Sequence, residues 1–152
     1  MTRFPRPEGH HSVTPGFAVP NAKQVLEFLQ NAFGGRVVDR YEDPGGRIAH
    51  CEMMLGDSVV MFGEANPAQG IEPMPASLSF YVDDGTAVDE IYRRALGAGG
   101  KSMMEPKDQF YGYRSATVKD PGGNKWTICA VVEQLTKKEI DARMAEIMKG
   151  AI

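Results

Sequence analysis

The chain consists of short alternating runs of apolar and polar residues that are separated by turn residues. Residues 77–82 (Ser-Leu-Ser-Phe-Tyr-Val) alternate with the period of two that is typical of a strand with one buried face. The side chains of Asp83 and Asp84 can cap a helix, and the pattern that follows predicts a helix over 87–96. Gly97 suits a left-handed residue at the end of that helix. This segment therefore predicts a strand, a polar turn and a helix.

The same pattern occurs once more, 63 residues earlier and without a gap. Apolar positions, a polar position at the turn and a glycine position all match at this offset. The matched pairs are Phe17 and Phe80, Val19 and Val82, Asn21 and Asp84, Val25 and Val88, Phe28 and Ile91, Ala32 and Ala95, Phe33 and Leu96, and Gly34 and Gly97. The two segments therefore form an internal repeat.

Strand-like runs follow each of the two predicted helices. They cover 36–41, 47–55 and 58–62 in the first half, and 101–104, 113–119 and 124–132 in the second. Two Asp-Pro-Gly-Gly stretches, at 43–46 and 120–123, are typical of hairpin turns, and residues 106–112 predict a loop. The order of one strand, one helix and three strands, present twice, predicts an α+β fold of two βαβββ modules with mostly antiparallel sheets.

These elements divide the chain into five parts. They are an N-terminal extension (1–12), a first module (13–65), a linker rich in Pro, Ala and Gly (66–75), a second module (76–132) and a C-terminal helix (133–152). Residues 136–139 (Thr-Lys-Lys-Glu) form a capping box at the start of the last helix. Its apolar stripe comprises Leu135, Ile140, Met144 and Ile147 or Met148. Such a stripe needs a surface to cover, either the sheet of the same chain or a second subunit.

Charge and composition exclude several classes of protein. The chain has 152 residues, a net charge of −3 and no long basic run, which excludes non-specific nucleic-acid binding. No run approaches the roughly 18 apolar residues of a membrane span, and the N-terminus lacks the apolar segment of a secretion signal. Cys51 and Cys129 are too few for a disulfide scaffold and lack the spacing of a zinc site. We therefore expect a cytoplasmic protein.

Two segments within the paired modules are distinctive. They are GGRIAHCEMMLGDSVVMFGE at 45–64 and DQFYGYRSATVKDPGGNKW at 108–126. The pair of modules, over about residues 13–132, resembles the vicinal oxygen chelate superfamily of glyoxalase I, bleomycin-resistance proteins and extradiol dioxygenases, and the two segments resemble its PhnB-like branch. The resemblance implies two curved sheets that form a cupped cavity, usually in a homodimer. Members of this superfamily also exchange modules between chains.

The resemblance also implies a divalent metal, held by residues on the first and fourth strands of each module. The family motifs place these positions at Thr14, Met61, Ser77 and Thr127. Divalent ions are held by imidazole nitrogens and carboxylate oxygens, which none of the four side chains supplies. We therefore expect the usual metal site to be absent, no cofactor to be needed, and these four residues to contact an organic ligand. The alternative is a divalent metal that binds at a relocated site.

His50 and Glu52 are candidates for catalysis. They lie two residues apart in a predicted strand, so both side chains point to the same face. A proton-transfer pair, or half of a relocated metal site, would have this arrangement. The alternative is a solvated or hydrogen-bonded pair at the rim of a sheet. His10 and His11, which precede the first strand, are predicted to be solvated.

Residues 107–114 have the composition of a binding loop. Aromatic side chains supply contact area there, while Gln109, Tyr111 and Arg114 can fix the orientation of a ligand. Arg114 could bind a carboxylate or a phosphate. In the alternative, Arg114 pairs with Asp108 and the aromatic residues close the end of the cup. Trp126 follows the alternation of a strand and is predicted to pack against a helix in the core.

Two functions agree with these residues. The first is a small-molecule-binding protein that holds an organic ligand in a dimeric cup without chemistry. The second is a lyase or isomerase that uses a relocated metal, or acid–base catalysis by His50 and Glu52. The chain lacks a glycine-rich nucleotide fingerprint, which argues against a methyltransferase. A homodimer is the expected assembly, with neither nucleic acid nor membrane as a partner.

Overall fold

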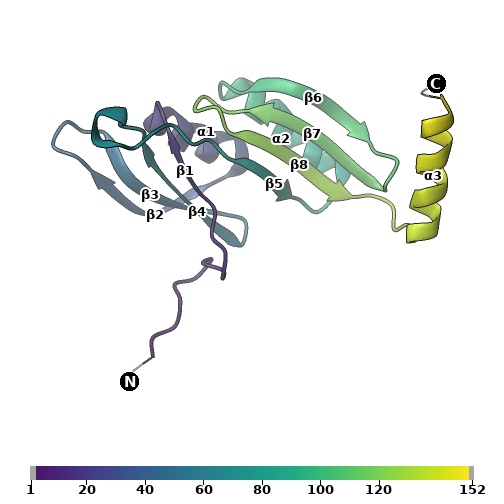
Figure 1. Ribbon diagram of the computed structural model, residues 1–152, viewed down its shortest axis with the longest axis horizontal. Helices are drawn as coiled ribbons and strands as arrows, with labels where there is room; N and C mark the ends of the chain where they lie inside the picture. Colours follow the sequence, from purple (N-terminus) through teal and green to yellow (C-terminus); the bar gives the residue numbers. More distant parts are fainter. Residues whose placement is uncertain (1–2, 151–152) are drawn as a thin grey trace.

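A computed structural model describes residues 3–150 and contains the predicted order of elements (Figure 1). The first module comprises β1 (Gly16–Val19), α1 (Ala22–Phe33), β2 (Arg36–Glu42), β3 (Ile48–Leu55) and β4 (Ser58–Glu64). A short 3-10 helix, η1 (Pro67–Gln69), lies in the linker. The second module comprises β5 (Ser77–Tyr81), α2 (Gly85–Gly97), β6 (Lys101–Asp108), β7 (Tyr113–Lys119) and β8 (Lys125–Val131), and α3 (Lys137–Gly150) follows it.

Each module forms one four-stranded mixed sheet. The strand orders are β1-β4-β3-β2 and β5-β8-β7-β6, so the two sheets have the same topology. The first and fourth strands of each module pair in parallel, and the other neighbours are antiparallel. The predicted α+β fold of two βαβββ modules is therefore confirmed.

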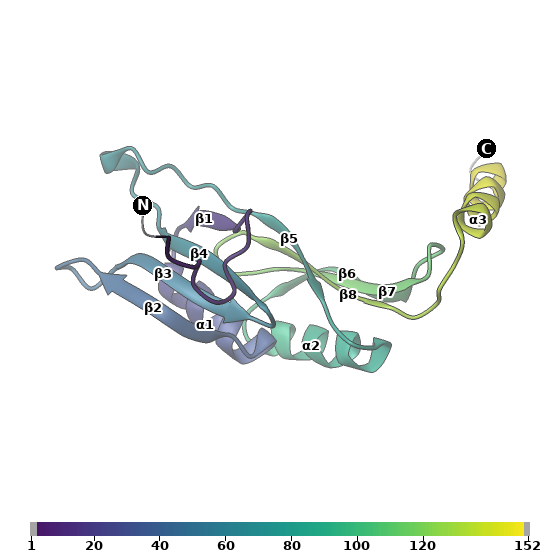
Figure 2. The same ribbon diagram turned by 90° about the horizontal axis from the view of Figure 1, so that it is seen from below.

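The helices α1 and α2 cover the same side of the two sheets, as Figure 2 shows. Phe33, at the end of α1, packs against Trp126 and Phe80 of the second module, with ring centroids 5.1 Å apart in both pairs. Trp126 is only 2% exposed, as predicted for a core residue. Apolar residues of both modules thus form one continuous core. The opposite face of each sheet carries no helix.

The turn between β7 and β8 is held by a buried carboxylate. Asp120 accepts hydrogen bonds from the backbone N–H groups of Gly122 and Asn124 and from the side chains of Asn124 and Trp126, at 2.8–3.0 Å. Asn124 in turn accepts from the backbone N–H of Ala76, at the start of β5. Charge-assisted bonds of this kind are among the stronger ones in proteins. They fix the indole of Trp126 against the first module.

Both Asp-Pro-Gly-Gly stretches form hairpin turns, as predicted. In the turn between β2 and β3, Asp43 accepts from the backbone N–H groups of Gly45 and Arg47. Its side chain is near the surface, whereas Asp120 is 5% exposed. The two turns therefore share a motif and differ in burial.

Two local predictions were wrong. The strand β6 continues to Asp108 through Pro106, because β6 is an edge strand with an irregular register in which a residue without an N–H group is tolerated. The helix α2 includes Gly97, and the left-handed residue after it is Gly99. The composition of the linker is typical of a flexible crossover, but Met74 exchanges two backbone hydrogen bonds with Ala18 of β1 and thereby fixes the end of the linker.

The helix α3 lies beyond the end of the second sheet in both views (Figures 1 and 2). Its start agrees with the capping-box prediction, since the Thr136 hydroxyl accepts from the backbone N–H of Glu139 at 3.2 Å. None of its residues is buried. The stripe therefore does not cover the sheet of its own chain, and a second subunit remains as its predicted partner. The predicted helix end at 151–152 lies outside the described residues, and no helix within 3–150 is long and apolar enough to span a membrane.

We predict that Asp120→Asn lowers the free energy of unfolding by about 3 kcal/mol. One of the buried N–H groups that donate to the Asp120 carboxylate would then face the amide N–H group of the asparagine. The matched control is Asp43→Asn, in the more exposed turn of the same sequence, with a loss below about 1 kcal/mol. Urea unfolding followed by circular dichroism measures both. Equal losses in the two variants would contradict the role assigned to the Asp120 network.

Candidate functional site

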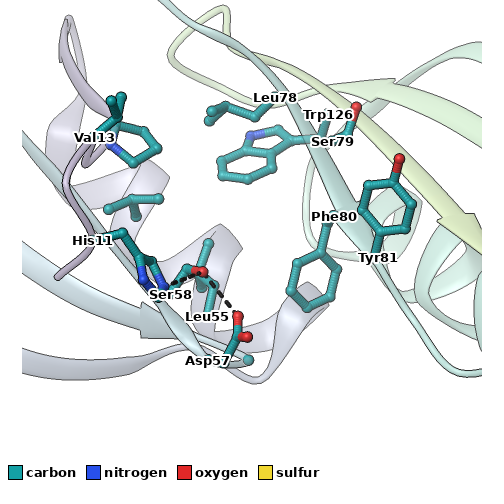
Figure 3. Close-up of a pocket in the computed structure, with 13 residues that line it drawn as sticks. His11, Val13, Leu55, Asp57, Ser58, Leu78, Ser79, Phe80, Tyr81 and Trp126 are labelled. Carbon is teal, nitrogen blue, oxygen red and sulfur yellow. Dashed lines mark hydrogen bonds between the residues drawn. The ribbon is translucent and has the colours of Figure 1, made fainter. Parts of the chain in front are cut away.

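A cavity of about 430 Å³ lies where the two modules meet (Figure 3). One wall comes from β5 and β8 of the second module and carries Leu78, Phe80 and Trp126. Because β5 is an edge strand, residues of its other face, Ser79 and Tyr81, line the same cavity. The wall is thus mainly apolar and aromatic, with hydroxyl groups at its margin. This composition is typical of pockets for small organic molecules.

The facing wall comes from the first module and from the chain before β1. We call residues 9–15 the hook, because they fold back along β4. The carbonyl oxygens of Gly9 and Pro15 accept hydrogen bonds from the backbone N–H groups of Val59 and Met61, at 2.9 and 3.0 Å. The hook supplies His11, Val13 and Pro15 to the pocket, and the β3–β4 turn supplies Leu55, Gly56, Asp57, Ser58 and Val60.

His11, Ser58 and Asp57 form the polar part of this wall. The Ser58 hydroxyl donates to the Asp57 carboxylate at 2.8 Å, and it lies 3.4 Å from Nε2 of His11. A serine nucleophile would need to give its proton to histidine, with the carboxylate orienting that histidine. Here the Ser58 hydroxyl donates its hydrogen bond to the Asp57 carboxylate instead. The three side chains therefore form a polar edge of the pocket and do not have the hydrogen-bond order of a catalytic triad.

His50 and Glu52 lie on the open face of the first sheet, as their spacing predicts. Glu52 is bonded to two histidines, at 2.5 Å from Nε2 of His10 and 3.2 Å from Nε2 of His50. The side chain of His10 is 14% exposed, so the prediction that it is solvated was wrong. The hydrogen bond to Glu52 is the main reason that the pKa of His10 lies above its usual value. Tyr41 of β2 packs beside His50.

The open face of the second sheet carries polar and aromatic side chains. The Gln109 amide donates to the Ser115 hydroxyl at 3.1 Å, and Tyr111 packs against Tyr113. Tyr113 lies against Tyr81, and the proximity of its phenol is the main reason that the pKa of Tyr81 is raised to about 12. Gln109 and Tyr111 do not line the pocket of Figure 3, although Tyr111 is connected through Tyr113 to its lining residue Tyr81.

Arg114 lies on the helix side of the second sheet. Its guanidinium donates to both carboxylate oxygens of Asp89 on α2, at 2.9 and 3.3 Å, and to Asp108 at 3.0 Å. These carboxylates hold the pKa of Arg114 above its usual value. The pairing with Asp108 is the alternative that the sequence left open, and Asp89 is an additional partner.

Both cysteines are buried and free, at Cys51 and Cys129. Burial raises the pKa of Cys51 to about 11 and raises that of Cys129 as well. A thiolate is the nucleophilic form, so neither side chain has the environment of a reactive cysteine.

A family model described as the Glyoxalase/Bleomycin resistance protein/Dioxygenase superfamily matches residues 10–128, which include most of the hook, the first module and the second module as far as β8. The chain belongs to this superfamily. An uncharacterized protein of Mycobacterium bovis is 27% identical over 143 residues, which cover 88% of this chain and 92% of that protein. An uncharacterized protein of Mycobacterium tuberculosis is also 27% identical over 143 residues, which cover 88% of this chain and 82% of that protein.

Solved structures of the superfamily agree on the fold. A glyoxalase/bleomycin resistance protein/dioxygenase family enzyme from Burkholderia phytofirmans superposes with a TM-score of 0.64 at 23% identity, over 76% of this chain and 94% of that one. TioX from Micromonospora sp. ML1 superposes with a TM-score of 0.65 at 21% identity, over 80% of this chain and 99% of that one. At these identities the likeness concerns the fold alone.

The superfamily's metal positions have the same register in both modules. Met61 lies opposite Gly16, two residues after Thr14, and Thr127 lies opposite Ser79, two residues after Ser77. The four positions are therefore equivalent in the two modules. Three hydroxyls and a thioether do not fit a divalent ion. Within residues 3–150, no three His, Cys, Asp or Glu side chains are arranged to hold a metal ion.

The sequence did not reveal the pocket itself. Residues from both predicted modules and the predicted extension meet there, and they are far apart in the chain. His11, Asp57, Ser58 and Phe80 carry no motif that marks them as a site. The available signal was the pair of adjacent histidines in a segment that precedes the repeat.

We expect untagged protein purified without chelators to contain far less than one divalent metal ion per chain, because the superfamily's donor set is replaced. Inductively coupled plasma mass spectrometry measures this, with His50→Ala as the control. Stoichiometric metal that is lost in His50→Ala would show a relocated site that includes this histidine. Stoichiometric metal that the variant retains would contradict the assigned register.

Proposed function

We propose that this protein binds a small organic molecule in the pocket between its two modules. The observation that carries the proposal is the pocket of Figure 3, in which an aromatic wall faces a polar edge across a cavity of about 430 Å³. This size and composition suit a drug-sized molecule with an apolar body. The superfamily membership agrees with a binding role but does not identify the ligand.

The lining side chains favour an uncharged or cationic ligand with an aromatic body. Within the described residues, no lysine or arginine lines the pocket, and Asp57 is the lining carboxylate. A ligand carboxylate or phosphate would therefore lose its hydration without a cation to replace it. Phe80 and Trp126 offer ring faces and edges, and His11 and Ser58 can exchange hydrogen bonds with a ligand hydroxyl, carbonyl or amine.

We also propose a homodimer within the PhnB-like branch, in the cytoplasm. The segments 45–64 and 108–126 support the branch, and the two free cysteines favour a reducing compartment.

The open faces of the two sheets lie on the same side of one chain, so a cup closed by two facing sheets needs a second chain (Figure 2). Light scattering should then give twice the chain mass of 16.6 kDa.

We predict that the neutral fluorophore N-phenyl-1-naphthylamine binds saturably and accepts excitation energy from Trp126, the single tryptophan of the chain. Phe80→Leu should weaken this binding about fivefold, because an aromatic wall contributes roughly 1 kcal/mol beyond the apolar area. Phe110→Leu is the matched control, since Phe110 lies in the β6–β7 turn outside the pocket lining. Equal affinity in both variants would place the fluorophore elsewhere and contradict the proposal.

A second candidate function is a lyase or isomerase that uses proton transfer. The supporting observation is the arrangement of Glu52, which contacts one ring nitrogen each of His10 and His50 on an open sheet face. A carboxylate between two imidazoles can accept a proton from one side and return it from the other. In this function, His10 acts together with His50 and Glu52, the two residues that the sequence predicts as a proton-transfer pair.

Turnover distinguishes the two functions. If proton transfer is the function, a screen of small carbonyl and hydroxy compounds should give saturable conversion that His50→Ala lowers at least about 100-fold. Conversion unaffected by His50→Ala would contradict this second function. Fluorophore binding without any conversion would favour the binding protein.

A further inference from the structure

The hook forms the pocket wall that faces Leu78 and Trp126, as Figure 3 shows for His11 and Val13. All of its residues precede β1, the first strand of the first module. It is attached along β4 by the backbone hydrogen bonds of Gly9 and Pro15. If the hook were released from β4, the pocket would lose three of its lining residues, and the part of Trp126 that lines the pocket would become accessible to solvent.

The hook is also closely packed at its beginning. Gly9 has a φ of +77°, and a Cβ atom there would lie 2.6 Å from Cε of Met54 and 2.9 Å from Cγ2 of Val59. Only glycine adopts this conformation without strain and also fits the space. The next residue, His10, directs its ring to Glu52 on the open face of the first sheet. We call the His10–Glu52 pair the latch.

His10 and His11 are adjacent in the chain, but their side chains lie at two different places in the fold. His10 binds Glu52, and His11 lines the pocket 3.4 Å from the Ser58 hydroxyl. Because the chain between them is a single peptide link, the position of one fixes the position of the other within a few ångströms. The contact that holds His10 therefore also holds the pocket wall in place.

We propose that His10 and Glu52 are positioning residues for the ligand pocket, and that the hook they hold is a lid that controls access to it. This inference rests on the proposed ligand site and names how access to that site is regulated. Neither residue lines the pocket. They act through the hook, which carries His11, Val13 and Pro15.

The charges around the latch give the lid a pH dependence. His10 faces Glu52 and His50 from β3, Asp39 and Tyr41 lie on the neighbouring strand β2, and Glu8 precedes it in the chain. The pKa of His10 is raised, mainly by its hydrogen bond to Glu52. The latch is therefore fully formed below the usual pKa of histidine, and it weakens as the pH rises through the raised pKa. The lid should open on the alkaline side.

The test uses the full chain without any ligand. Acrylamide quenching of fluorescence reports access to Trp126, the single tryptophan. Wild-type protein should show a rise of about twofold in the quenching constant between about pH 6 and pH 8. His10→Gln and Glu52→Gln should be quenched to the higher level at both values of pH. Circular dichroism and thermal unfolding verify that both variants are folded.

The matched control is His50→Gln, which removes the other histidine at Glu52 and leaves the hook untouched. It should keep the pH-dependent quenching of the wild type. Equal quenching in wild type, His10→Gln and Glu52→Gln at every pH would overturn the proposed lid. Loss of the pH effect in His50→Gln but not in His10→Gln would overturn the assignment of the latch. Since no ligand is present, these outcomes are distinct from a failure of the fluorophore to bind.

Discussion

The packing of Phe33 against Trp126 and Phe80 determines how the two modules lie relative to one another. Each βαβββ module buries one face of its sheet under its own helix, and the aromatic side chains join the two cores. Trp126 can serve this role because the Asp120 carboxylate accepts its indole N–H and thereby fixes the ring. The pocket exists because this contact brings β5 beside the β3–β4 turn of the other module.

The same contact explains why the candidate residues fall into separate groups. With both helices on one side of the sheets, the two open faces lie next to each other and do not enclose a common space (Figure 2). His50 and Glu52 lie on the first open face, while Gln109 and Ser115 lie on the second. Strand alternation therefore predicts that His50 and Glu52 share one sheet face. What lies opposite that face depends on how chains assemble.

The fold could be predicted from the sequence because it depends on local patterns. The repeat at an offset of 63 residues, the capping side chain of Asp84 and the two Asp-Pro-Gly-Gly turns each act within a few residues of the chain. Pro106 was misleading because a proline ends a central strand but not an edge strand, and the sequence does not indicate which strands are edges. The pocket could not be predicted, because its walls meet only through the contact between the modules.

The asymmetry between the modules explains why the pocket forms where it does. The fold repeats, but the chain that leads into each first strand does not. Before β5, the linker runs along β1, with Met74 bonded to Ala18, whereas before β1 the hook runs along β4 and carries His10 and His11. The repeated fold supplies two equivalent modules. The hook lies outside the repeat, so it adds a pocket wall to only one of them. The non-repeated hook thus makes the first module different from the second, while the cores of both modules keep the same arrangement.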